Sequence, residues 1–394
     1  MKPHSIRSGH CATGFSLIEL LVSMTIGLIV TLAITSVLVR SEGSKRSTTS
    51  VNDLNQTGAY AAYVLDRALR SAGSGFSQSW NPMYGCLLNA ASGGTQVLPA
   101  SFSASPTFVN VTASAMPVRL APVVIGKGLA NAGSQVRGDV LMVIGGTSGA
   151  AEMPVQVAPV SPSTTTWQVP NTLTYAPGNI VLLAEPGDAD GCMLQQLGSL
   201  DAVASTIQLA GTYYKDTVGG ASLAGFTSSA LMANLGSDVT NPPQIQLFGV
   251  GPNNSLFSYD LLQVGGNEQP IADGVVEMRA LYGLDTRITP GGLLDTWLDP
   301  VAGSGYEASV LLDGSAGSQV KLRRIIAVRL GFILRTSLPE RPQDYQQPAG
   351  TTLTLFSDLP TAVQQTRVLS TAELNYRFRL VETTIPLLNV QSAP

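Results

Sequence analysis

An uninterrupted apolar stretch runs from Phe15 to Val39, and Glu19 is its single ionisable residue. As a helix at 1.5 Å per residue it would be roughly 37 Å long, against about 30 Å for the hydrocarbon core of a bilayer. A secretory signal would be shorter and would end in a small-residue cleavage site. A buried helix of a soluble protein is the other alternative, but such helices are seldom so long and apolar. The pattern predicts a transmembrane helix over residues 15–39.

A second helical pattern follows in residues 40–73. Residues 41–50 are polar, so we expect the helix to loosen or break there and to restart at Ser50 with a capping-box pattern. Asp66 and Arg70 are spaced for an i,i+4 ion pair. Apolar and small residues at three- and four-residue steps predict a face that packs on a globular domain: Val51, Leu54, Gly58, Ala61, Ala62, Leu65, Ala68 and Leu69.

From residue 74 onward, short runs with β propensity alternate with turn residues, and the 40 glycines and 24 prolines fit such a pattern better than a helical bundle. Long loops are expected at residues 90–106, 211–230 and 338–352. The fold class predicted is α+β, in which a long N-terminal transmembrane and amphipathic helix precedes a large, mainly antiparallel β-rich domain. Six runs are predicted strands: Asp139–Ile144, Asn179–Ala184, Ile245–Val250, Val275–Tyr282, Ile325–Leu334 and Tyr376–Thr384.

The junction before the apolar stretch carries a motif. A short polar segment meets the stretch at Gly14 and Phe15, and the sequence from Gly14 reads GFSLIELL. This junction resembles the type IV prepilin motif, in which a glycine precedes a hydrophobic N-methylated residue and a glutamate stands at the fifth mature position. The resemblance implies that a prepilin peptidase cuts between Gly14 and Phe15 on the cytoplasmic side, and that the new amine of Phe15 is methylated.

Glu19 is a candidate functional residue. A carboxylate inside an apolar helix costs several kcal/mol unless it is paired. In the prepilin family its partner is the N-terminal amine of a neighbouring subunit, so the resemblance implies that Glu19 acts in subunit assembly. The alternative is a glutamate that snorkels to the headgroups, although lysine or arginine is more usual in that role.

Beyond the helix, the order of elements resembles the minor pilins of the PilW type. Residues 15–39 contain no proline, unlike the membrane helix of most major pilins, which also favours a minor subunit. The segments that carry the resemblance are YAAYVLDRALRSAG from Tyr60, Gly138-Asp139, Asp190-Gly191-Cys192, GVVEM from Gly274, YGLD from Tyr282, and the two closing strands.

This resemblance implies a minor pilin that takes part in type IV pilus assembly, in priming or in a tip complex, and supports twitching motility or adhesion. Its partners would be the prepilin peptidase, other minor pilins, the major pilin, inner-membrane lipid and the assembly platform. The chain would cross the inner membrane once, with a periplasmic C-terminal domain, and then enter the pilus or its tip. The predicted divisions are a leader peptide (1–14), a transmembrane and assembly helix (15–39), a periplasmic helical extension (40–73) and a β-rich pilin domain (74–394).

Cysteine and histidine usage limits the chemistry of the mature chain. Cys11 lies in the leader, and an even pair outside the cytoplasm, Cys86 and Cys192, favours a disulfide over two free thiols or a metal site. Closing a loop of roughly 100 residues would contribute about 4–5 kcal/mol. Both histidines, His4 and His10, precede the cleavage point, so catalysis by Ser-His-Asp or Cys-His and zinc binding through histidine are excluded. No metal or cofactor is predicted.

Chemistry by carboxylates alone stays open, but the sequence identifies no acid pair. Asp285, Asp295 and Asp299 are expected in turns. Asp188 and Asp190 slightly resemble the start of a calcium loop, yet its other acidic positions are missing, so a turn is expected there too. There is no P-loop or dinucleotide fingerprint, and a net charge of −4 offers no basic stripe for nucleic acid. The chain is not expected to be an enzyme.

Two other functions compete with the pilus role. A J-type pseudopilin of a type II secretion system shares the leader and the β-rich domain, although the chain length and the PilW-like segments favour the pilus. An alternative of another class is a membrane-anchored adhesin or periplasmic hydrolase, which needs a polar cleft that the sequence does not reveal.

Overall fold

The structure is a computed structural model, and it describes residues 14, 16–100, 105–112, 115–132, 135–148, 153–160, 165–189, 191–265, 268–288, 290–343 and 345–393. The chain packs as two compact units, Met1–Asp53 and Leu54–Pro394. One long helix, α1 (Leu17–Ser71), passes from the first unit into the second. The divisions predicted at residues 14, 39 and 73 stay predictions.

In its described part, the first unit is the N-terminal portion of α1. Residues Leu17–Val39 are long and apolar enough to cross a membrane, and none of this stretch is buried within the protein. The expected break at residues 41–50, with a restart at Ser50, is wrong, because α1 continues to Ser71. Serine, threonine, lysine and glutamate cost a helix little, and a single glycine costs about 1 kcal/mol, which does not end a long helix.

The second unit begins with the last turns of α1, where the predicted apolar face is confirmed. Five residues of this face are buried in the main core, together with Ala72 just after the helix, while Tyr60 and Tyr63 on the opposite side are exposed. The helix ends at Ser71, and Gly73 follows with a φ of 79°, in the left-handed region that glycine adopts freely. The buried residues are Leu54, Ala61, Leu65, Ala68, Leu69 and Ala72.

A nine-stranded sheet underlies these turns of α1, with the strand order β16-β15-β14-β4-β17-β19-β22. Its other two strands, β3 and β18, pair with β4 and β17. Neighbours are antiparallel except β4 and β17, which meet at one parallel pair. The strands are β3 (Val123–Ala132), β4 (Gln135–Gly145), β14 (Gln244–Val250), β15 (Ser255–Asp260), β16 (Gln269–Asp273), β17 (Val275–Leu284), β18 (Thr296–Leu298), β19 (Ile325–Arg335) and β22 (Phe378–Pro386). We call this the pilin sheet, after the domain that the sequence resemblance predicts.

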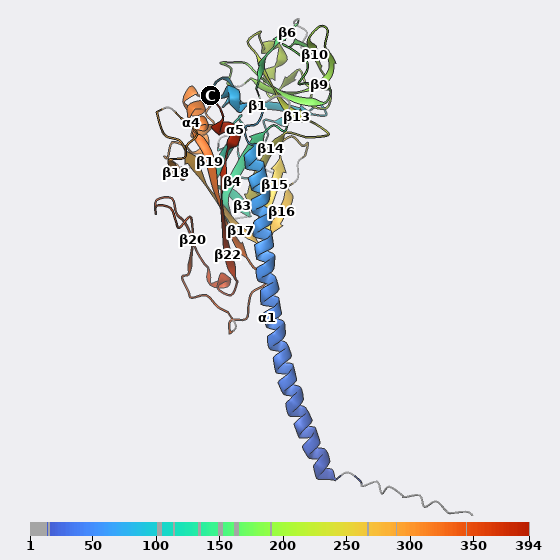
Figure 1. Ribbon diagram of the computed structural model, residues 1–394, viewed down its shortest axis with the longest axis vertical. Coiled ribbons are helices and arrows are strands. Elements are labelled where there is room, and N and C mark those ends of the chain that lie inside the picture. The colour runs from blue at the N-terminus through green and yellow to red at the C-terminus, as the bar shows by residue number, and fades with distance from the viewer. Residues whose placement is uncertain are drawn as a thin grey trace, which may run out of the picture. The chain divides into compact units, whose positions relative to one another are not determined.

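A second nine-stranded sheet, which we call the distal sheet, has the order β5-β13-β8-β9-β10-β7-β6, with β1 and β2 off this path. Figure 1 shows it at one end of the unit, beyond the C-terminal end of α1. Its separate apolar core is centred on Trp167, which is fully buried. The strands are β1 (Leu88–Ser92), β2 (Thr95–Leu98), β5 (Val155–Gln156), β6 (Ala158–Pro159), β7 (Thr166–Gln168), β8 (Asn179–Ala184), β9 (Cys192–Asp201), β10 (Thr206–Leu209) and β13 (Leu231–Ser237).

Short elements complete the second unit. The small hairpins are β11–β12 (Thr217–Val218, Ala221–Ser222) and β20–β21 (Thr352–Leu355, Gln365–Val368). The short α-helices are α2 (Trp80–Met83), α3 (Ala308–Leu311), α4 (Ala316–Arg323) and α5 (Leu388–Gln391). The 3₁₀ helices are η1 (Ser77–Ser79), η2 (Leu223–Gly225), η3 (Pro252–Asn254) and η4 (Thr371–Glu373).

The α+β fold class is confirmed, and each of the six predicted strands coincides with an observed one within three or four residues at either end. The loop expected at residues 90–106 is wrong in its first part, where β1 and β2 form a hairpin. Its turn is Gly93-Gly94, both at positive φ, so the glycines that suggested a loop instead make a tight reversal between strands.

Candidate functional site

Glu19 lies in the first turn of α1. The carbonyl of Ser16 accepts hydrogen bonds from the amides of Glu19 and Leu20, which starts the helix. The Glu19 side chain is exposed and has no hydrogen bond or ion pair with any described residue. Gly14 is also exposed, whereas Phe15 and residues 1–13, with Cys11 and both histidines, lie outside the described residues. Cleavage and methylation therefore stay predictions.

The other polar side chains of the apolar stretch contrast with Glu19. Each of the five hydroxyls between Leu17 and Val39 donates to a carbonyl three or four residues earlier on the same helix, at 2.6–2.9 Å. Such bonds satisfy a polar group where no water is present. The five residues are Ser23, Thr25, Thr31, Thr35 and Ser36. Between Leu17 and Val39, Glu19 is thus the one polar side chain that the described chain leaves unsatisfied.

Close packing fixes the C-terminal turns of α1 on the pilin sheet. A Cβ atom added at Gly58 would lie 2.9 Å from both Leu334 Cδ1 and Val381 Cγ2, so the helix passes directly over β19 and β22. The predicted i,i+4 pair is confirmed, with Arg70 Nε 2.7 Å from an Asp66 carboxylate oxygen on the solvent side.

The end of α1 is held by the end of the chain. The side-chain amide of Asn389, in α5, donates to the carbonyl of Ala72 at 3.1 Å and to that of Arg70 at 3.3 Å. The hydroxyl of Ser71 bonds to Gln244 of β14 at 2.7 Å. The two bonds from Asn389 satisfy carbonyls that a helix terminus leaves without partners, and the Ser71 bond fixes the last turn to β14. Sequence reasoning missed Asn389, because nothing in the local pattern links it to a helix more than 300 residues earlier.

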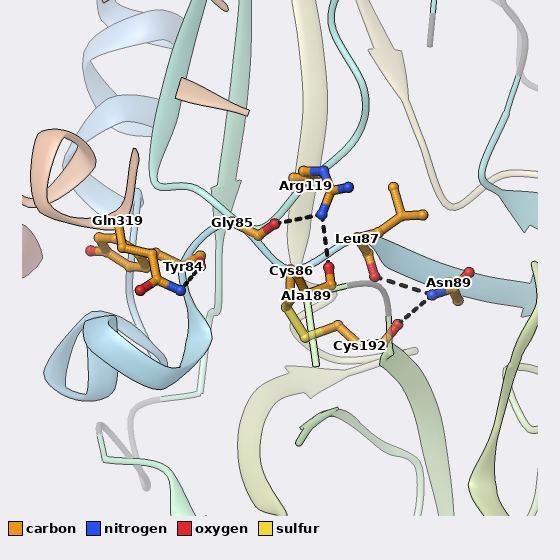
Figure 2. The surroundings of a disulfide bond; sticks show 9 residues. All are labelled: Tyr84, Gly85, Cys86, Leu87, Asn89, Arg119, Ala189, Cys192 and Gln319. Carbon is orange, nitrogen blue, oxygen red and sulfur yellow. Dashed lines mark hydrogen bonds between the residues drawn. A yellow bond between two sulfur atoms is a disulfide. The ribbon is translucent and has the colours of Figure 1, made fainter. Parts of the chain in front are cut away.

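The predicted disulfide between Cys86 and Cys192 is present, with Cα atoms 5.7 Å apart and both residues buried. Figure 2 shows that it lies where the chain enters the distal sheet, since Cys192 opens β9 and Leu88 of β1 pairs with it. The carbonyl of Cys86 accepts from the amide of Leu120, just before β3 of the pilin sheet. The disulfide therefore joins β9 of the distal sheet to the segment before β1, and that segment is hydrogen-bonded to the one that leads into β3 of the pilin sheet.

Hydrogen bonds around the disulfide reinforce this tie (Figure 2). The guanidinium of Arg119 donates to the carbonyls of Gly85 and Ala189 at 2.9 and 2.7 Å. The amide of Asn89 donates to the carbonyls of Leu87 and Cys192 at 3.1 and 3.0 Å. Arg119 thus links the segment before β3 to the segments before β1 and β9, and Asn89 links β1 to the start of β9.

Asp139 is a fully buried acid that the sequence offered only as a family landmark. Its carboxylate accepts from the amides of Gly128 and Ala280 at 3.0 and 2.9 Å, and the Arg279 guanidinium lies 3.4 Å away. Burial raises the pKa of Asp139, while the nearby cations act in the opposite direction. The contacts join β3, β4 and β17, which gives this acid a structural role in the pilin sheet.

The three aspartates that the sequence analysis considered as possible catalytic acids, Asp285, Asp295 and Asp299, also make structural contacts. The buried carboxylate of Asp285 accepts from Arg287 and from the amide of Gly291, and the Arg287 guanidinium is the main reason that its pKa is lowered. Asp295 accepts from the amide of Thr286, nine residues earlier, and directly precedes β18, so the turn expected there is wrong. Asp299, in contrast, bonds to Lys127 at 2.7 Å across the sheet.

Within the part of the chain that the structure describes, no cluster of three or more metal-ligating side chains occurs. Asp188 follows a turn at residues 186–187, and Asp190 lies outside the described residues. The polar side chains described above thus hold strands, loops and the end of α1 in place, and Glu19 at the start of α1 has no partner among the described residues.

Comparison with known proteins agrees with this picture. A family model described as "Type IV Pilus-assembly protein W" matches residues 250–389, and one described as "Prokaryotic N-terminal methylation motif" matches residues 10–35. The first match covers most of the pilin sheet and excludes the distal sheet, and the second covers Gly14 and Glu19. No curated protein and no solved structure matches the chain.

Proposed function

We propose that this chain acts as a minor pilin that primes the pilus or sits in its tip complex. It belongs to the PilW family of type IV pilus-assembly proteins and carries the N-terminal methylation motif. Its part in pilus assembly follows from the family, whose members are generally structural proteins. The methylation motif implies processing by a prepilin peptidase and an apolar helix that enters the inner membrane before the pilus.

The observation that carries the proposal is the unpaired carboxylate of Glu19. In an apolar helix whose hydroxyls are all satisfied internally, this one charge requires a cation from outside the chain. Cleavage between Gly14 and Phe15 would create a cationic amine at the same depth in each subunit. Glu19 of one pilin would then pair with the Phe15 amine of its neighbour and set the register between the two helices.

The distal sheet supports a low-copy position. It adds a second nine-stranded sheet to the region that the family model matches, which gives this subunit a wide domain. A wide domain is hard to repeat along a filament shaft but fits at an end. Counting subunits in purified pili tests this point, and a copy number close to that of the major pilin would contradict it.

The test of the function uses a strain that lacks the gene and receives the wild-type chain or Glu19→Gln. We expect the wild type to restore surface pili and Glu19→Gln to lower the pilus count at least about tenfold, because a pair in the membrane is worth more than 1.4 kcal/mol. Glu42→Gln is the matched control, since Glu42 is an exposed acid of the same helix beyond the apolar stretch. Normal pili with Glu19→Gln would refute the assembly role of Glu19.

The same deletion strain separates the competing functions. Lost pili and twitching with normal protein secretion support the minor pilin, whereas lost secretion with normal pili would assign the chain to a type II secretion system. Mass spectrometry of the N-terminal peptide checks the processing step, which should yield a methylated Phe15 as first residue.

A further inference from the structure

The strand β22 forms an edge of the pilin sheet that is open over nine residues. It pairs with β19 in a regular antiparallel register without a bulge. The Leu387 amide donates to Ile326 and the Thr336 amide donates to the Arg377 carbonyl, so odd-numbered residues of β22 face β19. The backbone groups of even-numbered residues therefore point away from the sheet, and they bond to no described residue: Phe378, Leu380, Glu382 and Thr384.

The other strands that end the two large sheets are protected. In the distal sheet, β5 and β6 are two residues long, and β6 includes Pro159. At the far edge of the pilin sheet, β16 has five residues, contains Pro270 and pairs through a bulge. Short strands, prolines and bulges are the devices by which proteins prevent unwanted strand pairing. Among these four strands, only β22 is long and free of bulges, and its one proline, Pro386, is its last residue.

Both faces of β22 are covered, which leaves its edge as the free side. On one face, Val381 packs beneath Gly58 of α1. On the other face, the Glu382 carboxylate accepts from the Phe356 amide at 2.7 Å and from Arg329 at 2.8 Å. Contacts on both faces and the unbroken register with β19 fix the strand in place, so its outward amides and carbonyls are preorganised for a partner.

The spacing of these unpaired groups determines what can bind. Outward N–H and C=O groups on alternate residues are satisfied together only by another extended polypeptide, as in strand addition at a sheet edge. We propose that β22 binds an extended segment of a different pilus subunit, which continues the pilin sheet into that subunit. This inference rests on the proposed role as a pilus subunit and names one of its contacts.

The charges on β22 favour a different subunit over a second copy. Arg379 is exposed and forms no ion pair with a described residue. In a two-fold pairing of β22 with itself, residues on the same face meet, and the α1 face of β22 carries only Arg379, Val381, Thr383 and Ile385. A second copy therefore offers Arg379 no carboxylate from this strand. The partner segment should carry an acidic residue on that face.

The test places a photo-crosslinking amino acid at Thr383 of the full chain, in cells that assemble pili. A second variant carries it at Thr352, an exposed residue of β20 away from the edge. We expect Thr383 to yield an adduct with another pilus subunit, identified by mass spectrometry, and Thr352 to yield none. An adduct of two copies of this chain, or equal adducts from both positions, would overturn the proposal.

Substitutions at the edge show whether strand pairing makes the contact. Thr384→Pro removes one outward amide without touching the bonds to β19, and we expect it to lower the adduct yield about tenfold. Thr384→Ala keeps the amide and should leave the yield unchanged. Equal yields from these two variants would overturn strand addition.

A second pair of variants covers the case in which Thr384→Pro fails to fold, which resistance to protease reveals. Arg379→Glu should lower the adduct yield several-fold through repulsion, whereas Arg379→Lys should keep it. Equal yields from these two would contradict the acidic partner. Pilus counts in the deletion strain are measured separately from adduct yields. A lost adduct with a normal pilus count removes only the edge contact, whereas a normal pilus count in the deletion strain itself contradicts the proposed function.

Discussion

The two halves of α1 share one helix but are adapted to different surroundings. Between Leu17 and Val39 the apolar side chains point in all directions and none is buried in the protein. Between Leu54 and Ser71 they form one stripe, which is buried on the pilin sheet. A helix that is apolar all round needs lipid or other helices, whereas a single stripe needs a domain to cover it. The same residue type should therefore matter differently in each half.

The largest difference is expected for leucine. Leu65→Ala removes a fully buried side chain from the main core, and we expect a loss of about 2–5 kcal/mol in the free energy of unfolding of the second unit. Leu28→Ala is the control, because Leu28 is 70% exposed in the apolar half. Urea titration of the full chain in mild detergent, followed by tryptophan fluorescence, measures both. Equal losses in the free energy of unfolding for the two variants would contradict the difference in burial between the two halves.

The two halves also differ in how much the sequence revealed. The long apolar helix was predicted correctly, and a methylation-motif model matches its junction, because both signals are local and continuous. The apolar stripe was also found, since its three- and four-residue spacing survives in the chain. The break expected at residues 41–50 was wrong because polar residues also form solvent-exposed helices, so polarity alone does not mark the end of a helix.

Contacts between segments far apart in the chain could not be predicted from the sequence. Six strands, namely β4, β8, β14, β17, β19 and β22, were recognised from their own composition, but their order in two sheets was not. Asn389 and Asp139 act through neighbours far along the chain, and no periodicity encodes such contacts. The disulfide was accessible because only two cysteines remain after the leader. Prediction therefore succeeded where chemistry is local or the choice of partners is small.

A smaller effect is expected for glycine. Gly58→Ala forces a Cβ to 2.9 Å from Leu334 and Val381, which overpacks the interface by about 1–3 kcal/mol, while the gain in helix propensity offsets up to about 1 kcal/mol. We expect a net loss of about 1–2 kcal/mol in the same titration. Gly27→Ala is the matched control in the apolar half, where nothing lies within 4 Å of the added Cβ. A stabilised Gly58→Ala protein would mean that the helix moves freely on the sheet.

The smallest effect concerns how the docked half ends. Asn389→Ala removes the donor shared by the carbonyls of Arg70 and Ala72, and we expect a loss of about 0.5–1 kcal/mol, because these carbonyls are partly open to water that replaces the amide. Asp66→Ala breaks an exposed ion pair of the same helix while it raises the helix propensity, so we expect a smaller loss than for Asn389→Ala. Added salt should abolish the effect of Asp66→Ala and leave that of Asn389→Ala, since only the first is a screened charge pair. If salt removes both effects, α5 does not hold the end of α1 through this amide, and packing on the sheet alone fixes the docked half.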